Sequence, residues 1–343
     1  MIFEQVATGG CQSYLVGCEA SRSAALIDPE LTQIDRYLGL AARDGLRIHY
    51  LIDTHTHADH FSATRELGER LDTPVVAHRL SPAPYVGLKL EDGELLQVGG
   101  LKVQALHTPG HTRDSMCLIC EDRVFTGDTL LIGGTGRTDL PTGNPEALHE
   151  SLFGKLLKLD PALTVFPAHD YKGRQSSTLG AEIAGNPRLQ KRELAAFVEM
   201  MTHLNLDAPT HLTEALRTNM NGGKTVTQLL AEAAAVVPFV SMTELARRLE
   251  GGVDPGFIVL DVREREAFAA GHIPGARHLP RGQLELRVDQ ELPDPTARIL
   301  TACEFGRIST LAAATLRTMG FVRAAALDGG MKAWREAGLP LES

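Results

Sequence analysis

Three histidines and one aspartate fall within the six residues from His55 to His60, in the segment THTHADH that begins at Thr54. The apolar run Tyr50-Leu51-Ile52 precedes them, so a strand ending at Asp53 would place these side chains on a loop, where chemistry usually resides. Neutral histidine nitrogens bind iron, zinc, copper and nickel. A solvated polar turn would not need four ligand-type residues so close together, so the segment predicts a metal site.

Further ligand-type residues lie in three later segments that read as turns. His111 stands in TPGHT, Asp128 follows a strand-like run in TGDT, and His169 follows another in FPAHD. Each one comes at the end of an apolar run. A folded sheet would therefore bring all three residues to the same rim as the first cluster.

The surrounding sequence predicts the elements that position these residues. Strands are expected at 13–16, 24–27, 95–98, 101–106, 115–119, 123–126 and 163–166, and helices at 34–44, 63–71 and 146–159. Gly99-Gly100 and Glu121-Asp122 are typical of the turns of antiparallel hairpins. Mixed sheets flanked by helices predict an αββα layered domain.

A second domain is predicted after a stretch of helix and turn signals at 190–240. Beyond it a helix at 242–249, strands at 257–260 and 298–301, and a helix at 309–319 alternate. That order predicts a parallel-sheet α/β domain of about a hundred residues. We place the two domains at 1–235, including a helical tail, and at 238–343.

Length, charge and cysteine content predict a soluble protein of the cytoplasm. The 343 residues predict two or three domains, and the net charge of -9 disfavours nonspecific binding to nucleic acid or to an anionic membrane. No signal peptide is expected, and the longest apolar stretch, 233–240, is far shorter than the ~20 residues of a membrane span. An odd, sparse set of cysteines indicates a reducing compartment: Cys11, Cys18, Cys117, Cys120 and Cys303.

The order HxHxDH, PGHT, GD and PAHDY resembles the metallo-β-lactamase superfamily, from residue 1 to about 235. Within it, the runs 136–139 (GRTD), 167–171 (PAHDY) and 186–188 (NPR) are similar to glutathione-dependent persulfide dioxygenases. The resemblance implies a single Fe(II) in each chain, held by His55, His111 and Asp128. It also implies that four neighbouring residues support the ligands without binding iron: His57, Asp59, His60 and His169.

Two histidines and one carboxylate leave open positions on iron for a substrate sulfur and for O2. The resemblance implies oxidation of glutathione persulfide to sulfite and glutathione. It makes Arg137 and Arg188 candidates for binding the glutathione carboxylates, because a guanidinium can bind a carboxylate with two hydrogen bonds. Surface ion pairs are the alternative for both arginines. Tyr171 would place its hydroxyl near the iron.

The alternative to the dioxygenase activity is hydrolysis of glutathione thioesters by a dinuclear metal site of the glyoxalase II type. All seven residues of such a site are present, so ligand count alone does not separate the two activities. However, glyoxalase II usually has other residues after the arginine that corresponds to Arg137, and a Gly-His-Glu-Tyr run where this chain has 168–171 (AHDY). These differences favour the dioxygenase.

A different chemistry is predicted for Cys303, which stands between a predicted strand and a predicted helix in the run TACEFGRIST. Backbone N–H groups of such a loop, the following helix N-terminus and a nearby arginine favour a thiolate or a bound persulfide. The alternative is an inert buried cysteine. Glu304, Gly306 and Arg307 are poor neighbours for a buried core residue, which favours the reactive interpretation.

Residues 238–343 resemble a single rhodanese domain, on the motifs DVRE (261–264), GHIPGA (271–276) and LDGG (327–330) and on the C-terminal residues 333–340. The resemblance implies transfer of sulfane sulfur between thiosulfate and glutathione through a Cys303 persulfide. It assigns catalysis to Cys303 and Arg307, and substrate binding to Glu304, Phe305 and Gly306. Many rhodanese loops carry arginine at the sixth loop position, where this chain has Ile308, and this departure leaves the sulfur donor open.

The two resemblances together predict a persulfide dioxygenase–rhodanese fusion. Glutathione persulfide and sulfite would be common to both reactions, and covalent linkage raises the local concentration of a shared intermediate. A hydrolase with an appended sulfur-carrier domain is the second interpretation, and a rhodanese domain that only senses sulfur species is the third. Family resemblance also suggests a homodimer.

Overall fold

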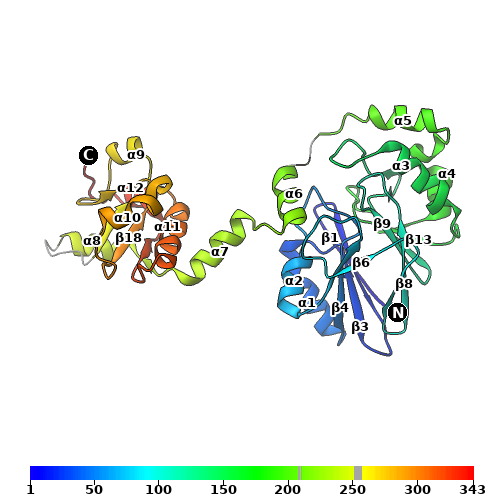
Figure 1. The fold of residues 1–343 in the computed structure, drawn as a ribbon, viewed down its shortest axis with the longest axis horizontal. Helices are drawn as coiled ribbons and strands as arrows, with labels where there is room; N and C mark the ends of the chain where they lie inside the picture. Colours follow the sequence, from blue (N-terminus) through cyan, green and yellow to red (C-terminus); the bar gives the residue numbers. More distant parts are fainter. Residues whose placement is uncertain (208, 210, 251–256) are drawn as a thin grey trace. The chain divides into compact units, whose positions relative to one another are not determined.

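The structure is a computed structural model that describes residues 1–207, 209, 211–250 and 257–343 (Figure 1). The chain divides into two compact units, Met1–Gly223 and Lys224–Ser343. Helix α7 (Val226–Val236) belongs to the second unit in this division. The domain limits inferred from the sequence, 1–235 and 238–343, stay a prediction.

The N-terminal unit contains two six-stranded sheets. The first has the order β1 (Ile2–Thr8), β2 (Cys11–Gly17), β3 (Ser23–Ile27), β4 (Arg47–Ile52), β5 (Val75–His78), β6 (Leu88–Leu90). The second has the order β14 (Ser177–Thr178), β13 (Thr164–Pro167), β10 (Arg123–Gly127), β9 (Met116–Cys120), β8 (Leu101–His107), β7 (Leu95–Val98). A small pair, β11 (Leu130–Leu131) and β12 (Gly134–Thr135), follows β10.

The two sheets face each other across one apolar core, and helices cover their outer faces (Figure 1). Tyr14 and Ile52 of the first sheet meet Phe125 and Phe166 of the second in this core. Helices α1 (Ile34–Arg43) and α2 (Thr64–Leu71) pack on the first sheet. Helices α3 (Pro145–His149), α4 (Leu179–Gly185) and α5 (Leu194–Thr202) pack on the second. The predicted αββα sandwich is confirmed.

Strand β9 shows how side-chain alternation divides the two cores. Cys120 lies in the core between the sheets, whereas Cys117 lies in the core beneath the outer helices. Burial raises the pKa of each thiol to about 11, so neither is a reactive thiolate near neutral pH. The two thiols are therefore structural, as the opposite faces of a strand predict.

The helix predicted over 146–159 is not one α-helix. Helix α3 ends at His149, a π-helical turn spans Glu150–Lys155, and a 3-10 turn spans Leu156–Lys158. Within the π-helical turn, the Ser151 hydroxyl donates to the Pro109 carbonyl at 2.6 Å. The widened turn therefore holds the loop that carries His111.

Strand directions bring the ligand-bearing loops to one edge of the sandwich. Strands β3, β4 and β5 are parallel in the first sheet, and β10 is parallel to β13 in the second. Their carboxyl ends precede the loops that carry Asp28, His55, Asp128 and His169. Because β2 is antiparallel to β3, the beginning of β2, with Cys11, lies at the same edge.

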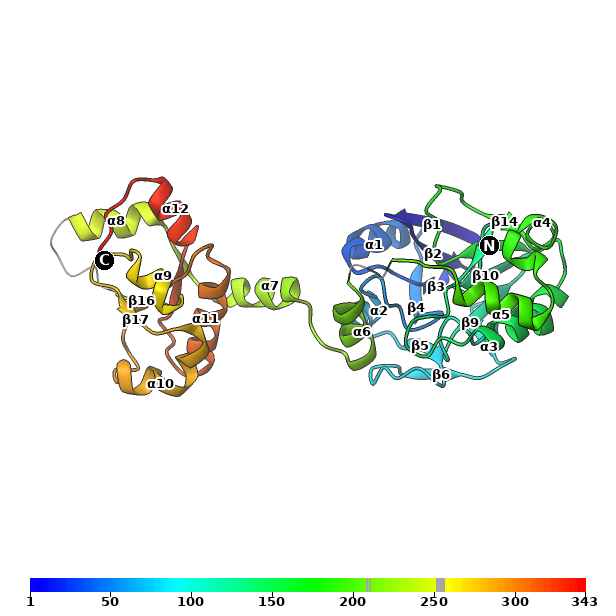
Figure 2. The same cartoon turned by 90° about the horizontal axis from the view of Figure 1, so that it is seen from above.

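The C-terminal unit is built on one parallel sheet, as predicted, in the order β15 (Phe239–Val240), β19 (Ala325–Leu327), β18 (Ile299–Ala302), β16 (Ile258–Asp261), β17 (Arg277–His278). Helices α8 (Met242–Glu250) and α12 (Gly330–Glu336) cover one face, and α10 (Leu284–Glu291) and α11 (Arg307–Thr318) the other (Figure 2). The short α9 (Arg265–Ala269) follows β16. Within the described residues, no helix combines the length and apolar character that a membrane crossing requires.

Candidate metal centre and cysteine loop

The three residues predicted to bind metal converge at the sandwich edge. One ligand atom from each of His55, His111 and Asp128 lies within 4.8 Å of the others. His111 Nε2 is 3.6 Å from Asp128 Oδ2, and both imidazoles are buried. His111 and Asp128 lie 56 and 73 residues after His55 in the sequence, so separate loops supply the three members of the set.

Hydrogen bonds orient both imidazoles toward this point. His55 Nδ1 lies 3.0 Å from Thr54 Oγ1, whose hydroxyl donates to Asp28 Oδ2 at 2.8 Å. His111 Nδ1 donates to the Arg137 carbonyl at 2.8 Å. Because a carbonyl accepts only, the Nδ1 of His111 carries a proton, and in the neutral imidazole Nε2 then keeps its lone pair.

Burial and the neighbouring His57 lower the pKa of His55 to about 3, so its imidazole is neutral at physiological pH. A neutral imidazole is the form that binds metals. Two buried imidazoles with occupied Nδ1 atoms and a carboxylate therefore fit a divalent metal ion such as Fe(II).

Asp28 is a buried anchor that sequence reasoning did not select. Its carboxylate accepts from the Thr54 backbone N–H at 2.7 Å and the Thr54 hydroxyl at 2.8 Å, and it lies 3.1 Å from His57 Nε2. His57 therefore faces Asp28 and Asp53, which form a separate group with it. The available signal was an acidic residue directly after the apolar strand 24–27, the same pattern that marked Asp128.

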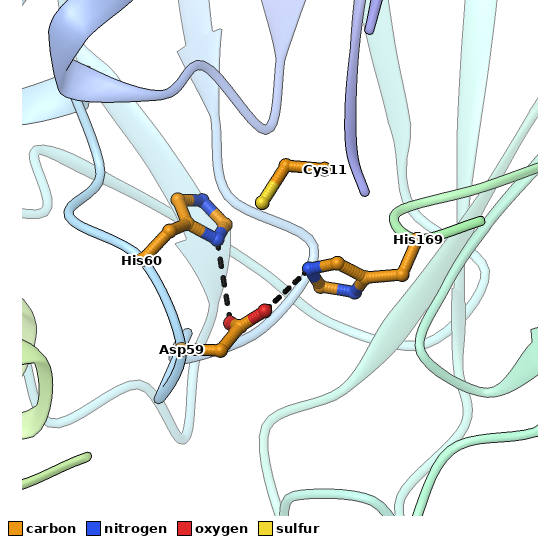
Figure 3. Close-up of side chains that lie close together, drawn as sticks. All are labelled: Cys11, Asp59, His60 and His169. Carbon is orange, nitrogen blue, oxygen red and sulfur yellow. Dashed lines mark ion pairs between the residues drawn. The ribbon is translucent and has the colours of Figure 1, made fainter. Parts of the chain in front are cut away.

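A second cluster lies beside the first and contains Cys11, Asp59, His60 and His169 (Figure 3). Asp59 forms ion pairs with both histidines, at 3.3 Å from His60 Nδ1 and 2.6 Å from His169 Nε2. Burial opposes ionisation of Asp59, yet these pairs hold the pKa of its carboxyl well below the usual range. Asp59, His60 and His169 are three of the four residues that the sequence predicted to support the metal ligands, whereas Cys11 was not among them.

Cys11 joins this cluster from the beginning of β2. Burial alone would raise the pKa of its thiol, but contacts with His169 and His60 lower it below the ordinary value. The chain pairing that places it here is a bridge between Cys11 and His169, in which the Gln12 N–H donates to the Ala168 carbonyl at 2.7 Å. Only the pairing of segments that are distant in the sequence, and no local sequence pattern, reveals that Cys11 lies in this cluster.

Two residues outside the predicted set hold the site loops. Asn219, on α6 (Leu212–Asn221), donates from Nδ2 to the carbonyls of His57 and His60 at 2.9 and 2.8 Å. Gly136 has no side chain at a point where a Cβ would lie 1.9 Å from the Asp128 carbonyl oxygen. The helix thus fixes the histidine segment, and the glycine permits close approach of the backbone to Asp128.

The predicted glutathione contacts differ in their availability. Arg137 is engaged by both oxygens of Asp139, with distances of 2.6 and 2.7 Å. Arg188 is half-buried, donates to the Thr135 carbonyl at 2.6 Å, and has no acidic partner among the residues that the structure describes. Tyr171 is 75% exposed, and its ring is parallel to that of His169 at 6.0 Å.

In the second unit, Cys303 lies at the predicted strand-to-helix loop between β18 and α11. Its Sγ accepts from the Ser309 backbone N–H at 3.1 Å and lies 3.3 Å from the Ser309 hydroxyl. Gly306 takes a left-handed conformation, with φ of 81°, where α11 begins. The loop is attached to α12, because the Met331 N–H donates to the Cys303 carbonyl at 2.8 Å. The sulfur therefore faces the first turn of α11.

The chain matches the metallo-beta-lactamase superfamily over residues 6–169 and a rhodanese-like domain over residues 241–337. The human persulfide dioxygenase ETHE1, mitochondrial, is 38% identical over 214 residues, which are 62% of this chain and 84% of the relative. A hydroxyacylglutathione hydrolase of Anaeromyxobacter dehalogenans is similar over a shorter stretch, with 36% identity over 172 residues, 50% of this chain and 66% of the relative.

Solved structures agree with these relationships. ETHE1 from Myxococcus xanthus is 40% identical, with a TM-score of 0.63 over 64% of this chain and 98% of that one. A metallo-beta-lactamase from Staphylococcus aureus has a TM-score of 0.62 at 22% identity, over 96% of this chain and 98% of that one, and supports the fold alone. The chain therefore belongs to the persulfide dioxygenase family of the metallo-β-lactamase superfamily and carries a rhodanese-like domain after its metallo-β-lactamase domain.

Proposed function

We propose that this protein is a bifunctional sulfur-metabolism enzyme. Its N-terminal unit oxidises glutathione persulfide with O2 to sulfite and glutathione, at a single Fe(II) held by His55, His111 and Asp128. Its C-terminal unit transfers sulfane sulfur between thiosulfate and glutathione through Cys303. The observation that carries the proposal is the convergence of the three ligand atoms within 4.8 Å, with both histidines oriented through their Nδ1 atoms.

When bound at this set, Fe(II) would supply open coordination positions for a sulfur and for O2. The protein would supply orientation and charge. The carboxylate of Asp128 is held by His169, whose Nδ1 lies 2.6 Å from Oδ1. Asp59 pairs with the other nitrogen of His169. Such supporting contacts typically change metal affinity or activity by about 10- to 100-fold.

Glutathione binding is assigned to Arg188, supported by its unmatched and half-buried charge. Burial lowers the pKa of Arg188, and a carboxylate partner would offset this desolvation of its guanidinium. Arg137 would have to release Asp139 before its guanidinium could bind a substrate carboxylate with two hydrogen bonds. Tyr171, exposed beside His169, is assigned to substrate binding as well.

In the C-terminal unit, the Cys303 thiolate would attack the outer sulfur of thiosulfate. The S–S bond of thiosulfate breaks, sulfite leaves, and a Cys303 persulfide remains. A glutathione thiolate then attacks the outer sulfur of that persulfide, which releases Cys303 and forms glutathione persulfide. The Ser309 N–H would stabilise the anionic sulfur, because it donates to Sγ at 3.1 Å.

The first test is O2 uptake by the iron-loaded protein supplied with glutathione persulfide, with sulfite measured in parallel. Rapid uptake with an equal amount of sulfite is expected. Absence of uptake from protein that demonstrably holds iron would contradict the dioxygenase assignment. Sulfur transfer is tested separately, with thiosulfate as the donor and glutathione as the acceptor. Residence in the cytoplasm and a homodimer stay predictions.

A second candidate function is hydrolysis of a glutathione thioester, with the rhodanese unit as a sulfur carrier. The observation that favours it is the second cluster, where Asp59, His60 and His169 converge with Cys11 in a manner that suits a second metal. Within the described part of the chain, the buried nitrogens of His60 make no well-aligned hydrogen bond, and Nδ1 has only the ion pair with Asp59 at 3.3 Å. Two bound zinc ions and thioester cleavage without O2 consumption would favour this function over the dioxygenase.

A further inference from the structure

A hollow of about 340 Å³ lies over Cys303 and is walled by two elements of the C-terminal unit. The cysteine loop and α11 contribute Phe305, Ile308 and Leu311, and α7 contributes Val226 and Leu230. Neither side chain of α7 was singled out by the rhodanese resemblance. The wall of this hollow therefore comes partly from the segment that joins the two domains.

Helix α7 presents this wall in a defined orientation. Val226 and Leu230 are one turn apart and lie on the same helix face. Thr225 and Gln228 close the first turn with a capping box, in which the Gln228 N–H donates to Thr225 Oγ1 at 3.1 Å. The helix packs on α11, with Ala233 buried. Both apolar side chains are therefore fixed relative to Cys303.

Several side chains of the hollow expose apolar surface to water. Val226 is 50% exposed, Ile308 51% and Phe305 64%. A ligand that covers such surface gains binding free energy roughly in proportion to the apolar area removed from water. A ligand with an organic body gains this contribution, whereas a small hydrated dianion does not cover these walls.

Among the charged side chains that the structure describes around the hollow, one cationic side chain is available to bind a ligand. Glu304 is matched by Arg335 and, at 3.5 Å, by Arg263. Arg307 also lines the hollow, and its guanidinium has no ion-pair or hydrogen-bond partner among the described residues. A ligand that carries a carboxylate would complete this charge pair.

We propose that α7 and Ile308 form a binding site for the organic part of a low-molecular-weight thiol or persulfide that carries a carboxylate, with Arg307 as the carboxylate contact. The inference rests on the sulfur transfer proposed above and specifies its thiol substrate class. Val226, Leu230 and Ile308 determine specificity, and only Cys303 reacts. Thiosulfate would use Arg307 and Cys303 but not the α7 wall.

The transfer at this site is an exchange of one S–S bond for another. The Cys303 thiolate attacks the terminal sulfur of the organic persulfide, the ligand S–S bond breaks, and the organic thiolate leaves as the Cys303 persulfide forms. In the reverse direction the organic thiolate attacks the outer sulfur of that persulfide. Neither direction requires an added oxidant or reductant.

Leu230→Ala in the full chain tests the proposal, with Leu229→Ala as the matched control. Leu229 is 43% exposed on the same helix but does not line the hollow. With thiosulfate as donor, Leu230→Ala should raise the KM for glutathione about tenfold, because the substitution removes apolar groups from the pocket that binds it. Turnover with cyanide as acceptor should change less than twofold, and the control should resemble the parent. Equal effects on both acceptors, or no effect on either, would overturn the proposal.

A binding measurement separates failure of this inference from failure of sulfur transfer itself. S-Methylglutathione, which cannot accept sulfur, should slow iodoacetamide alkylation of Cys303, as measured by mass spectrometry of its peptide. Protection that is lost in Leu230→Ala and kept in Leu229→Ala supports the site even if the parent protein shows no turnover. Absence of protection in the parent protein would overturn the site, even if thiosulfate–cyanide turnover is normal.

Discussion

His169 Nδ1 lies 2.6 Å from Asp128 Oδ1, and this contact joins the two ionisable clusters of the N-terminal unit. The other nitrogen of His169 lies 2.6 Å from a carboxylate oxygen of Asp59. Burial opposes a charged imidazole, yet the two carboxylates raise the pKa of His169 well above its ordinary value. Asp128 is thus both a proposed metal ligand and the acceptor of a buried cation, which holds its carboxylate in one orientation.

Substitution of His111 by alanine should remove iron and abolish persulfide-dependent O2 uptake. The change deletes one of three ligand atoms that lie within 4.8 Å of one another. Sulfur transfer from thiosulfate should persist, because Cys303 belongs to the other compact unit. Iron content by elemental analysis and O2 consumption with an electrode measure both effects. Retention of full iron content in the variant would contradict the ligand assignment.

The reciprocal variant is Cys303→Ser. Thiosulfate sulfurtransferase turnover should fall to the limit of detection, because a serine hydroxyl does not form a persulfide. Persulfide-dependent O2 uptake and iron content should stay within about twofold of the parent. Loss of both activities in a folded variant would disprove two independent sites, and undiminished sulfur transfer would favour a rhodanese unit that only senses sulfur species.

Thr54→Val tests the chain of hydrogen bonds that runs from Asp28 through Thr54 to His55. Loss of the hydroxyl leaves the His55 Nδ1–H without its acceptor, and iron affinity should fall about tenfold or more. Competition with a chelator of known affinity measures the change. Thr56→Val is the matched control, because the Thr56 hydroxyl donates at 2.6 Å to Asp114 instead. Similar losses in both variants would contradict the role of this chain.

Arg188→Ala should raise the KM for glutathione persulfide by about 10- to 100-fold, the effect of losing a charge-assisted hydrogen bond worth about 1.5–3 kcal/mol. The iron content should not change. Arg137→Ala should have a smaller effect on KM, since that guanidinium is already bound to Asp139. Steady-state O2 uptake at varied persulfide concentration compares the two. A larger effect at Arg137 would reverse the assignment.

The pH dependence of stability should contain a contribution from His78. Its ring stacks on that of His107 with centroids 3.8 Å apart, and burial together with His107 lowers the pKa of His78 to about 4. The unfolded histidine, with a pKa near 6.5, binds more protons than the folded one between these values. The contribution of His78 to the free energy of unfolding is therefore fully present above about pH 6.5 and is lost as the pH falls toward 4.

Urea unfolding of the metal-free protein at pH 7 and pH 5 measures this contribution. The parent should lose about 2 kcal/mol more than His78→Phe over this interval. His49→Phe serves as the control for removal of a histidine elsewhere on the same sheet. An equal pH dependence in the parent and in His78→Phe would contradict the prediction.

The two-domain organisation, the αββα and parallel-sheet folds, and the segments that supply ligand-type residues could be predicted from the sequence. His55, His111, Asp128 and Cys303 each follow an apolar strand-like run or stand in a turn, so local patterns marked them as candidates. The resemblance to persulfide dioxygenases then singled out His55, His111 and Asp128 among the ligand-type residues. Hydrophobic periodicity and turn residues reflect only a few neighbouring positions, so they can be recognised without knowledge of the fold. The π-helical turn after His149 was missed because a continuous helical pattern does not reveal a local widening of the helix.

Which of these residues face one another follows from the packing of segments that are distant in the sequence. Asp28 supports His55 because β3 and β4 are parallel neighbours, and Cys11 meets His169 because β2 begins where β13 ends. Likewise, Leu230 lies over Cys303 because α7 packs on α11. The physical reason is the same in each case. Strand order and helix docking depend on the burial of apolar surface across the whole domain, and local patterns do not specify which distant segments share that core.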